Sequence, residues 1–275
     1  ALGLPLAERA ASSDAVMLYA ALLALLLPLL VGALRLSEER TSTSLEIERA
    51  ALALAVPGFG LVLGLIPLHA WVLTLASGTP RAMLLGVLAL VQTAGFVMLL
   101  RTLESYAWLA GAGQGALVAG GAVSALIGGW LAWSARLDDP DDFLVYAVVA
   151  NGGILLAGLG ARSAAAGSGV ALLLFARVLA LVILALAPRA GTDLRRWAYA
   201  VGVLTLAGFP GLAGFPGLWI VLRRLPDSGS SPLAPIAVLV STMLLFATAM
   251  RRWSIEDPPG EGSSPGAPGA RRAVV

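Results

Sequence analysis

One histidine, His69, is the only side chain of the 275-residue chain that could exchange a proton near neutral pH. It lies beside Pro67 in the stretch PGFGLVLGLIPLHAWVLTLASGTP, residues 57–80, inside an otherwise apolar run. Apolar runs of this kind are typical of membrane helices. A proline or glycine break is tolerated there only where neighbouring protein or a water-lined cavity satisfies the freed backbone groups. This stretch is therefore a candidate centre for proton transfer or for helix packing.

The cationic side chains are all of one kind. The 18 basic residues are arginines, and lysine does not occur. Arginine stays protonated at any physiological pH, whereas a buried lysine can be brought to release and regain a proton. A lysine-based proton relay is therefore excluded.

Arg177 lies in the middle of the apolar run LLLFARVLALV, where a charge costs at least about 2.5 kcal/mol. One interpretation is an electrostatic element that faces a polar cavity or an anionic lipid head group. The other is a salt bridge to a residue of a neighbouring subunit. We favour the salt bridge, because no Asp or Glu of this chain falls at mid-membrane depth.

Other kinds of chemistry have little support. The acidic residues at 138–142, DDPDD, are typical of a solvated loop that leads into a helix. GAGQG at 111–115 follows no strand, so a dinucleotide-binding loop is not indicated. With no cysteine and a single histidine, neither a thiolate metal site nor a Ser-His-Asp set can form. We expect no catalytic residues, no metal, no cofactor and no nucleic-acid partner.

Composition places the elements that carry these residues in a membrane. Hydrophobic residues make up 59% of the chain, charged residues 12%, and the mean hydropathy is +0.89. We predict an all-α polytopic membrane protein with about eight transmembrane helices, two of them discontinuous. The expected spans are residues 15–34, 49–75, 82–100, 115–135, 143–160, 168–187, 196–222 and 235–250.

Prolines and glycines mark the two discontinuous helices. The first is interrupted at Pro57-Gly58 and at Pro67, and the second by two GFPG copies that contain Pro210 and Pro216. An even number of spans places both ends of the chain on one side of the membrane. Ten arginines on that side against seven on the other favour cytoplasmic termini.

Three motifs resemble one known family. PLHAW followed by GTP is similar to its P-[LF]-H-x-W…A-P-T-P signature, and LTLAGFPGLAGF is similar to its L-S-L-x-G-[IL]-P-P-x-A-G-F-x-x-K. VYAVVANGG at 145–153 is similar to its A-Y-S-S-I-x-H-x-G. The family comprises the antiporter-like membrane subunits of respiratory complex I (NADH-quinone oxidoreductase) and of the multisubunit cation/proton antiporters. All three motifs occur in the family's order, over roughly residues 14–250.

The resemblance implies an inverted-repeat architecture with an incomplete first repeat. The chain then divides into a polar N-terminal lead at 1–14, a remnant of the first helical repeat at 15–104, a second helical repeat at 115–250 and a disordered C-terminal tail at 251–275. It also implies a place in the cell inner (plasma) membrane, in contact with lipids and with other integral membrane subunits of a respiratory-type complex.

The resemblance further implies which residues would carry protons. Two family lysines fall on Val62 and Leu218, a Lys or His of the next helix falls on Gln92, and the motif histidine falls on Asn151. The counterpart of His69 lies at a helix break, which favours a role for its ring in capping freed carbonyls over a role in proton transfer. The candidate residues for a polar path or a structural break are His69, Gln92, Asn151, Arg177, Pro67, Pro210 and Pro216.

Three functions remain open. The first is a structural subunit of a complex I-like assembly that has kept the fold and lost the relay. The second is an active proton or cation translocating module that uses Gln92, Asn151, His69 and water. The third is a subunit that forms part of a quinone or lipid site at an interface. Because the family lysines are missing and no cofactor signature is present, we expect the first: a non-catalytic, mainly structural subunit that does not itself pump protons.

Overall fold

The computed structural model describes residues 45–135, 140–187, 192–228 and 232–255. This part of the chain is helical and contains no strand. Its long apolar helices, each able to cross a membrane by length and composition, are α4 (Arg81–Ser105), α5 (Ala107–Ser134), α6 (Pro140–Gly160), α7 (Ala164–Leu186) and α10 (Leu233–Ile255). The other helices are α2 (Leu45–Leu63), α3 (Ala70–Gly78), α8 (Thr192–Leu206), α9 (Gly214–Arg224) and the short 3-10 helix η2 (Pro226–Ser228).

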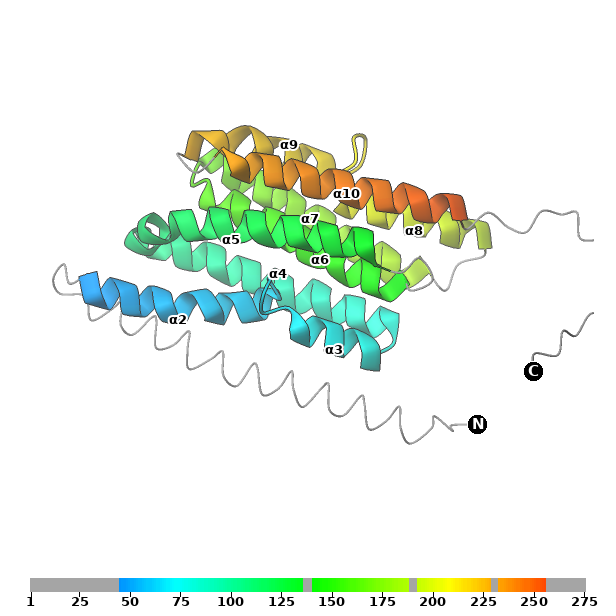
Figure 1. Ribbon diagram of the computed structural model, residues 1–275, viewed down its shortest axis with the longest axis horizontal. Coiled ribbons are helices and arrows are strands. Elements are labelled where there is room, and N and C mark those ends of the chain that lie inside the picture. The colour runs from blue at the N-terminus through cyan, green and yellow to red at the C-terminus, as the bar shows by residue number, and fades with distance from the viewer. Residues whose placement is uncertain (1–44, 136–139, 188–191, 229–231, 256–275) are drawn as a thin grey trace, which may run out of the picture.

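The helices run along the long axis of the molecule (Figure 1). α2 and α3 follow one another along one edge, and α8 and α9 follow one another near the opposite edge. α6 lies deepest, since nearly all of its apolar stretch is buried within the protein. The polytopic all-α class is thereby confirmed. The pair α2 and α3 occupies the place of the first expected discontinuous helix, and the pair α8 and α9 that of the second.

Glycines bring α5 and α6 into backbone contact. A Cβ atom at Gly121 would collide with the backbone nitrogen of Ala157, and one at Gly153 with that of Ala125. Small residues at a crossing let membrane helices approach closely. On its other side, α5 receives a hydrogen bond from α10, where the Ser241 hydroxyl donates to the carbonyl of Ala125 (2.6 Å). α5, α6 and α10 thus form a tightly packed frame.

Some expected helix limits are wrong. Pro57-Gly58 does not interrupt the first discontinuous helix, because α2 continues through it to Leu63. A proline removes a single backbone donor, and the surroundings of a membrane helix can compensate for that loss. α5 begins at Ala107 rather than near residue 115, since its early glycines lie inside the helix, and α10 extends past residue 250 to Ile255.

Several expectations lie outside the described residues. They are the polar lead at 1–14, the helix at 15–34, the first residues of the acidic loop at 138–142 and the tail beyond residue 255.

Candidate functional site: a buried arginine between two helix breaks

The first discontinuous helix breaks at Gly64, directly after α2. Gly64 has a φ of +61°, a left-handed conformation that glycine adopts without strain. Its N–H donates to the carbonyl of Leu61 (3.2 Å), and the N–H of Leu65 donates to that of Gly60 (3.1 Å). This pair of bonds is the Schellman motif of a glycine-terminated helix. The chain then turns through Pro67, which is exposed, before α3 begins.

The second break, after α8, ends its helix in the same way. Gly208 has a φ of +70°, and its N–H donates to the carbonyl of Thr205 (3.1 Å). The N–H of Phe209 donates to the carbonyl of Leu204 (2.9 Å). The two discontinuous helices therefore share one kind of C-terminal end.

Only one of the two GFPG copies interrupts the helix. Pro210, in the first copy, is exposed in the turn between α8 and α9. Pro216, in the second copy, lies within the first turn of α9, where a missing N–H would have had no intrahelical partner in any case. The expectation that the second copy also breaks the helix is wrong.

Gln92 binds the end of α2 from the neighbouring α4. Its side chain is fully buried, and its Nε2 donates to the carbonyl of Leu63 (3.0 Å). The indole Nε1 of Trp71 donates to the carbonyl of Leu61 (2.8 Å). Gln92 thus pairs the carbonyl of Leu63, and Trp71 adds a second donor to the carbonyl of Leu61, which also accepts from Gly64. An unpaired backbone group in lipid would cost several kcal/mol.

Asn151 plays the same part at the end of α8. It lies on α6, is 2% exposed, and donates from Nδ2 to the carbonyl of Leu206 (3.0 Å). Each of the two amides thus uses its NH₂ group on a helix-end carbonyl and keeps its oxygen free to accept from another donor.

Arg177 of α7 is that donor for both amides. It is 1% exposed, and its Nη1 donates to Oδ1 of Asn151 (3.0 Å) and to the carbonyl of Val148 (3.0 Å). Its Nη2 donates to Oε1 of Gln92, and its Cζ lies 5.9 Å from the ring centroid of Phe96. We call Gln92, Arg177 and Asn151 the arginine junction, because they form a continuous chain of hydrogen bonds from one helix break to the other.

Helix dipoles, rather than a carboxylate, surround the charge of Arg177. Among the described residues, its hydrogen-bond partners are two neutral amides and a backbone carbonyl. The C-terminal ends of α2 and α8, at Leu63 and Leu206, are the two helix ends that the junction binds. The C-terminus of a helix carries about half a negative charge, which favours a nearby cation. Both helix breaks therefore help to stabilise the buried guanidinium.

This arrangement corrects both interpretations of Arg177 made from the sequence. The guanidinium does not reach a neighbouring subunit, because it is buried within its own chain. It does not face a lipid head group or an open polar cavity either, since its hydrogen-bond partners lie on α4 and α6.

His69 stands apart from the junction. Its backbone precedes α3, its side chain makes no capping hydrogen bond, and its buried Nδ1 has no partner among the described residues. Its ring lies near that of Tyr146, with centroids 6.3 Å apart. The expected role of the ring in capping freed carbonyls is wrong, because Trp71 and Gln92 cap them instead.

The positions that correspond to family lysines are packed with apolar atoms. Leu218 is 5% exposed and lies against Gly208, where an added Cβ would be 2.5 Å from its Cδ2. Val62 packs against Gly95 in the same manner. The described residues also contain no group of three or more His, Asp or Glu side chains that could hold a metal ion.

The sequence did not reveal which side chains form hydrogen bonds with the backbone at the first break. Trp71 belongs to a quoted motif, but nothing in that motif indicates its bond to Leu61. Ser124, whose Oγ accepts from the N–H of Ile66 (3.2 Å), lies in an apolar helix with no motif around it. The signal that the sequence offered for this bond was a polar residue, Ser124, within an apolar run.

The junction holds charge but is not suited to pass a proton. Arginine keeps its proton at physiological pH, and the amides of Gln92 and Asn151 do not titrate there. Their hydrogen bonds are already committed to the two helix breaks. The chemistry that the site supports is therefore structural cross-linking of the breaks.

Solved structures of low sequence identity share this fold. A chain of respiratory complex I from Thermus thermophilus with bound NADH is similar with a TM-score of 0.71 and 22% identity, over 87% of this chain and 56% of that one. A chain of the Mrp complex from Dietzia sp. DQ12-45-1b has a TM-score of 0.73 and 17% identity, over 88% and 50%. A chain of Thermus thermophilus complex I with bound aureothin has a TM-score of 0.68 and 24% identity, over 88% and 58%.

These similarities show the fold, which is the one that the three motifs predict. The chain spans about half the length of the solved chains that it matches. No family model and no curated protein matches the sequence. Together with the long apolar helices, the shared fold makes the chain a multi-pass membrane protein.

Proposed function

We propose that this chain is a mainly structural, antiporter-like subunit of a complex I-like membrane assembly and does not itself translocate protons. Its partners are other integral membrane subunits. It lies in the cell inner (plasma) membrane with its termini on the cytoplasmic side. The fold shared with chains of complex I and of the Mrp complex supports this placement.

The arginine junction is the observation that carries the proposal. A relay needs groups that alternately hold and release a proton within hydrogen-bonded reach of one another. In this chain the buried polar centre is one permanent cation and two amides, all hydrogen-bonded to one another. The positions of the family lysines, Val62 and Leu218, hold apolar side chains.

A second candidate function, active proton or cation translocation, is favoured by one observation. The Nδ1 atom of His69 is buried and has no hydrogen-bond partner among the described residues. An unpaired imidazole nitrogen could take up a proton from water that enters the break. This role would require a path that avoids the arginine junction.

One experiment separates the two functions. The assembly is purified in mild detergent, its subunits are identified by intact-complex mass spectrometry, and it is reconstituted into vesicles. The number of protons moved per electron transferred, or per exchanged cation, is then compared between the wild type and His69→Phe, which keeps a ring beside Tyr146. We expect the ratio to be unchanged. A lower ratio with all subunits retained would refute the structural function and support translocation through His69.

A further inference from the structure

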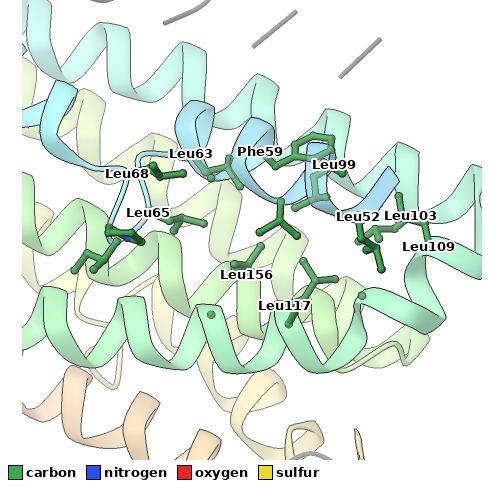
Figure 2. A pocket seen from close by; sticks show the side chains of 18 residues that line it. Leu52, Phe59, Leu63, Leu65, Leu68, Leu99, Leu103, Leu109, Leu117 and Leu156 are labelled. Atoms are coloured by element: carbon green, nitrogen blue, oxygen red, sulfur yellow. The ribbon is translucent and has the colours of Figure 1, made fainter. Parts of the chain in front are cut away.

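An apolar cavity of about 160 Å³ lies between α2, α4 and α5 (Figure 2). Leu52 of α2, Leu103 of α4 and Leu109 of α5 lie together at one end of it, and Leu65 lies at the other. Every residue that lines the cavity is hydrophobic, glycine or proline, and the cavity is partly open to the outside. A space of this kind has no polar partners that could hold water.

The cavity runs along α2, from Leu52 to the first helix break. Its outer end is lined by Leu52 of α2 and lies beside the turn that joins α4 to α5. Its inner end is set by Leu63, Leu65 and Pro67. From Leu52 to Leu63 the helix rises by about 16 Å, at 1.5 Å per residue.

A cation stands at the outer end. Arg49 is exposed and lies three residues before Leu52 and seven before Val56, on the face of α2 that lines the cavity. Among the described residues it forms no ion pair. A guanidinium forms bidentate hydrogen bonds with phosphate, so Arg49 complements a phosphate group at the level of the lipid head groups.

We propose that this cavity binds one acyl chain of an anionic phospholipid, whose phosphate lies against Arg49. The phosphate and the chain would then occupy the outer and the inner parts of one continuous site. Inside a bilayer, binding of the chain is favoured by dispersion contacts with the lining atoms. An empty cavity would leave those atoms without neighbours on one side. A dry apolar cavity of about 150 Å³ is known to hold a small hydrocarbon.

The bound chain would also support the helix break. Leu63 and Leu65 line the cavity, and the carbonyl of Leu63 is the group that Gln92 binds. An acyl chain packed against these residues would fill the space beside the break. This inference does not depend on whether the assembly moves protons.

The test uses phosphatidylglycerol with a photoreactive diazirine in the middle of one acyl chain, added to membranes that contain the complete assembly. Labelled residues are mapped by mass spectrometry. We expect adducts on the cavity-lining faces of α2 and α5. Gly120 lines the cavity with open space at its Cβ position, so Gly120→Leu should remove most of this labelling.

The matched control is Gly115→Leu, at an exposed position of α5 that also has open space but does not line the cavity. It should leave the labelling unchanged. Ala116→Leu, a second cavity-filling change, repeats the test if Gly120→Leu fails to fold. Equal labelling in the filling and control variants would overturn the proposal.

Two further arms identify the ligand. Arg49→Gln should weaken labelling by phosphatidylglycerol about fivefold, the equivalent of about 1 kcal/mol for one basic residue near an anionic lipid. It should not change labelling by the matching phosphatidylcholine probe. An equal loss with both probes would overturn the role of the phosphate. Displacement of the label by an equimolar isoprenoid quinone would overturn the phospholipid in favour of a quinone.

Discussion

Nη1 of Arg177 lies 3.0 Å from Oδ1 of Asn151, and the same amide donates to the carbonyl at the end of α8. A cation on α7 thus holds a capping group on α6 in place. Through Nη2 it holds Gln92, the capping group of α2, as well. The two helix breaks, which are far apart in the sequence, are therefore joined by one side chain.

We expect Arg177→Met to destabilise the protein by about 2–6 kcal/mol. The change leaves two buried amide oxygens without their charged donor, and each such loss costs about 1–3 kcal/mol. The measurement is thermal unfolding in detergent, followed by tryptophan fluorescence.

The control for this prediction is Arg101→Met. Arg101 pairs with Glu104 on the surface, with side chains 78% and 54% exposed, and such pairs contribute little. Equal melting temperatures for Arg177→Met and the wild type would show that the junction contributes nothing to stability.

The glycines that end α2 and α8 should not tolerate a side chain. A left-handed backbone costs a residue with a Cβ about 1–2 kcal/mol. In addition, the new Cβ would lie 2.7 Å from Val72 in Gly64→Ala and 2.5 Å from Leu218 in Gly208→Ala. Both variants should melt at a lower temperature than the wild type.

Gly86→Ala provides the comparison for these variants. Gly86 lies inside α4 with open space at its Cβ position. Alanine is up to about 1 kcal/mol more favourable than glycine within a helix, so this variant should be as stable as the wild type or more so. If all three changes had the same effect, the assigned helix-end geometry would be wrong.

The packing of α5 on α6 allows a test with two adjacent residues. Gly121→Ala would press a methyl group into the backbone at Ala157, whereas Gly120→Ala would place one in open space. Overpacking of this kind typically costs about 1–3 kcal/mol. We expect Gly121→Ala alone to lower the melting temperature, and an equal loss in Gly120→Ala would argue against the close crossing.

The sequence was a good guide to the helices and to the presence of two breaks. Apolar length predicts the spans, and Pro67 and Pro210 lie in the breaks as expected. It was a poor guide to which proline interrupts a helix. Pro57 and Pro216 lie within helices, because a proline breaks a helix only where the surrounding contacts favour another path.

The arginine junction could be predicted only in part. The motifs indicate Gln92 and Asn151 as polar positions, and the burial of Arg177 follows from its apolar neighbours. Their contact does not follow, since Arg177 is 85 residues from Gln92 and 26 from Asn151 along the chain. The packing of α4, α6 and α7 sets the geometry, and a sequence without a carboxylate at this depth suggested a partner outside the chain.

The most direct test of this account disturbs one break and observes the other. Hydrogen–deuterium exchange is measured by mass spectrometry for Gln92→Met and for Ser124→Ala. Each loses a contact of the first break, and only Gln92 contacts Arg177. If Arg177 joins the breaks, Gln92→Met should speed exchange at residues 61–69 and also at 204–213, while Ser124→Ala should affect only 61–69. Faster exchange at the first break alone in Gln92→Met would contradict the claim that the arginine junction unites them.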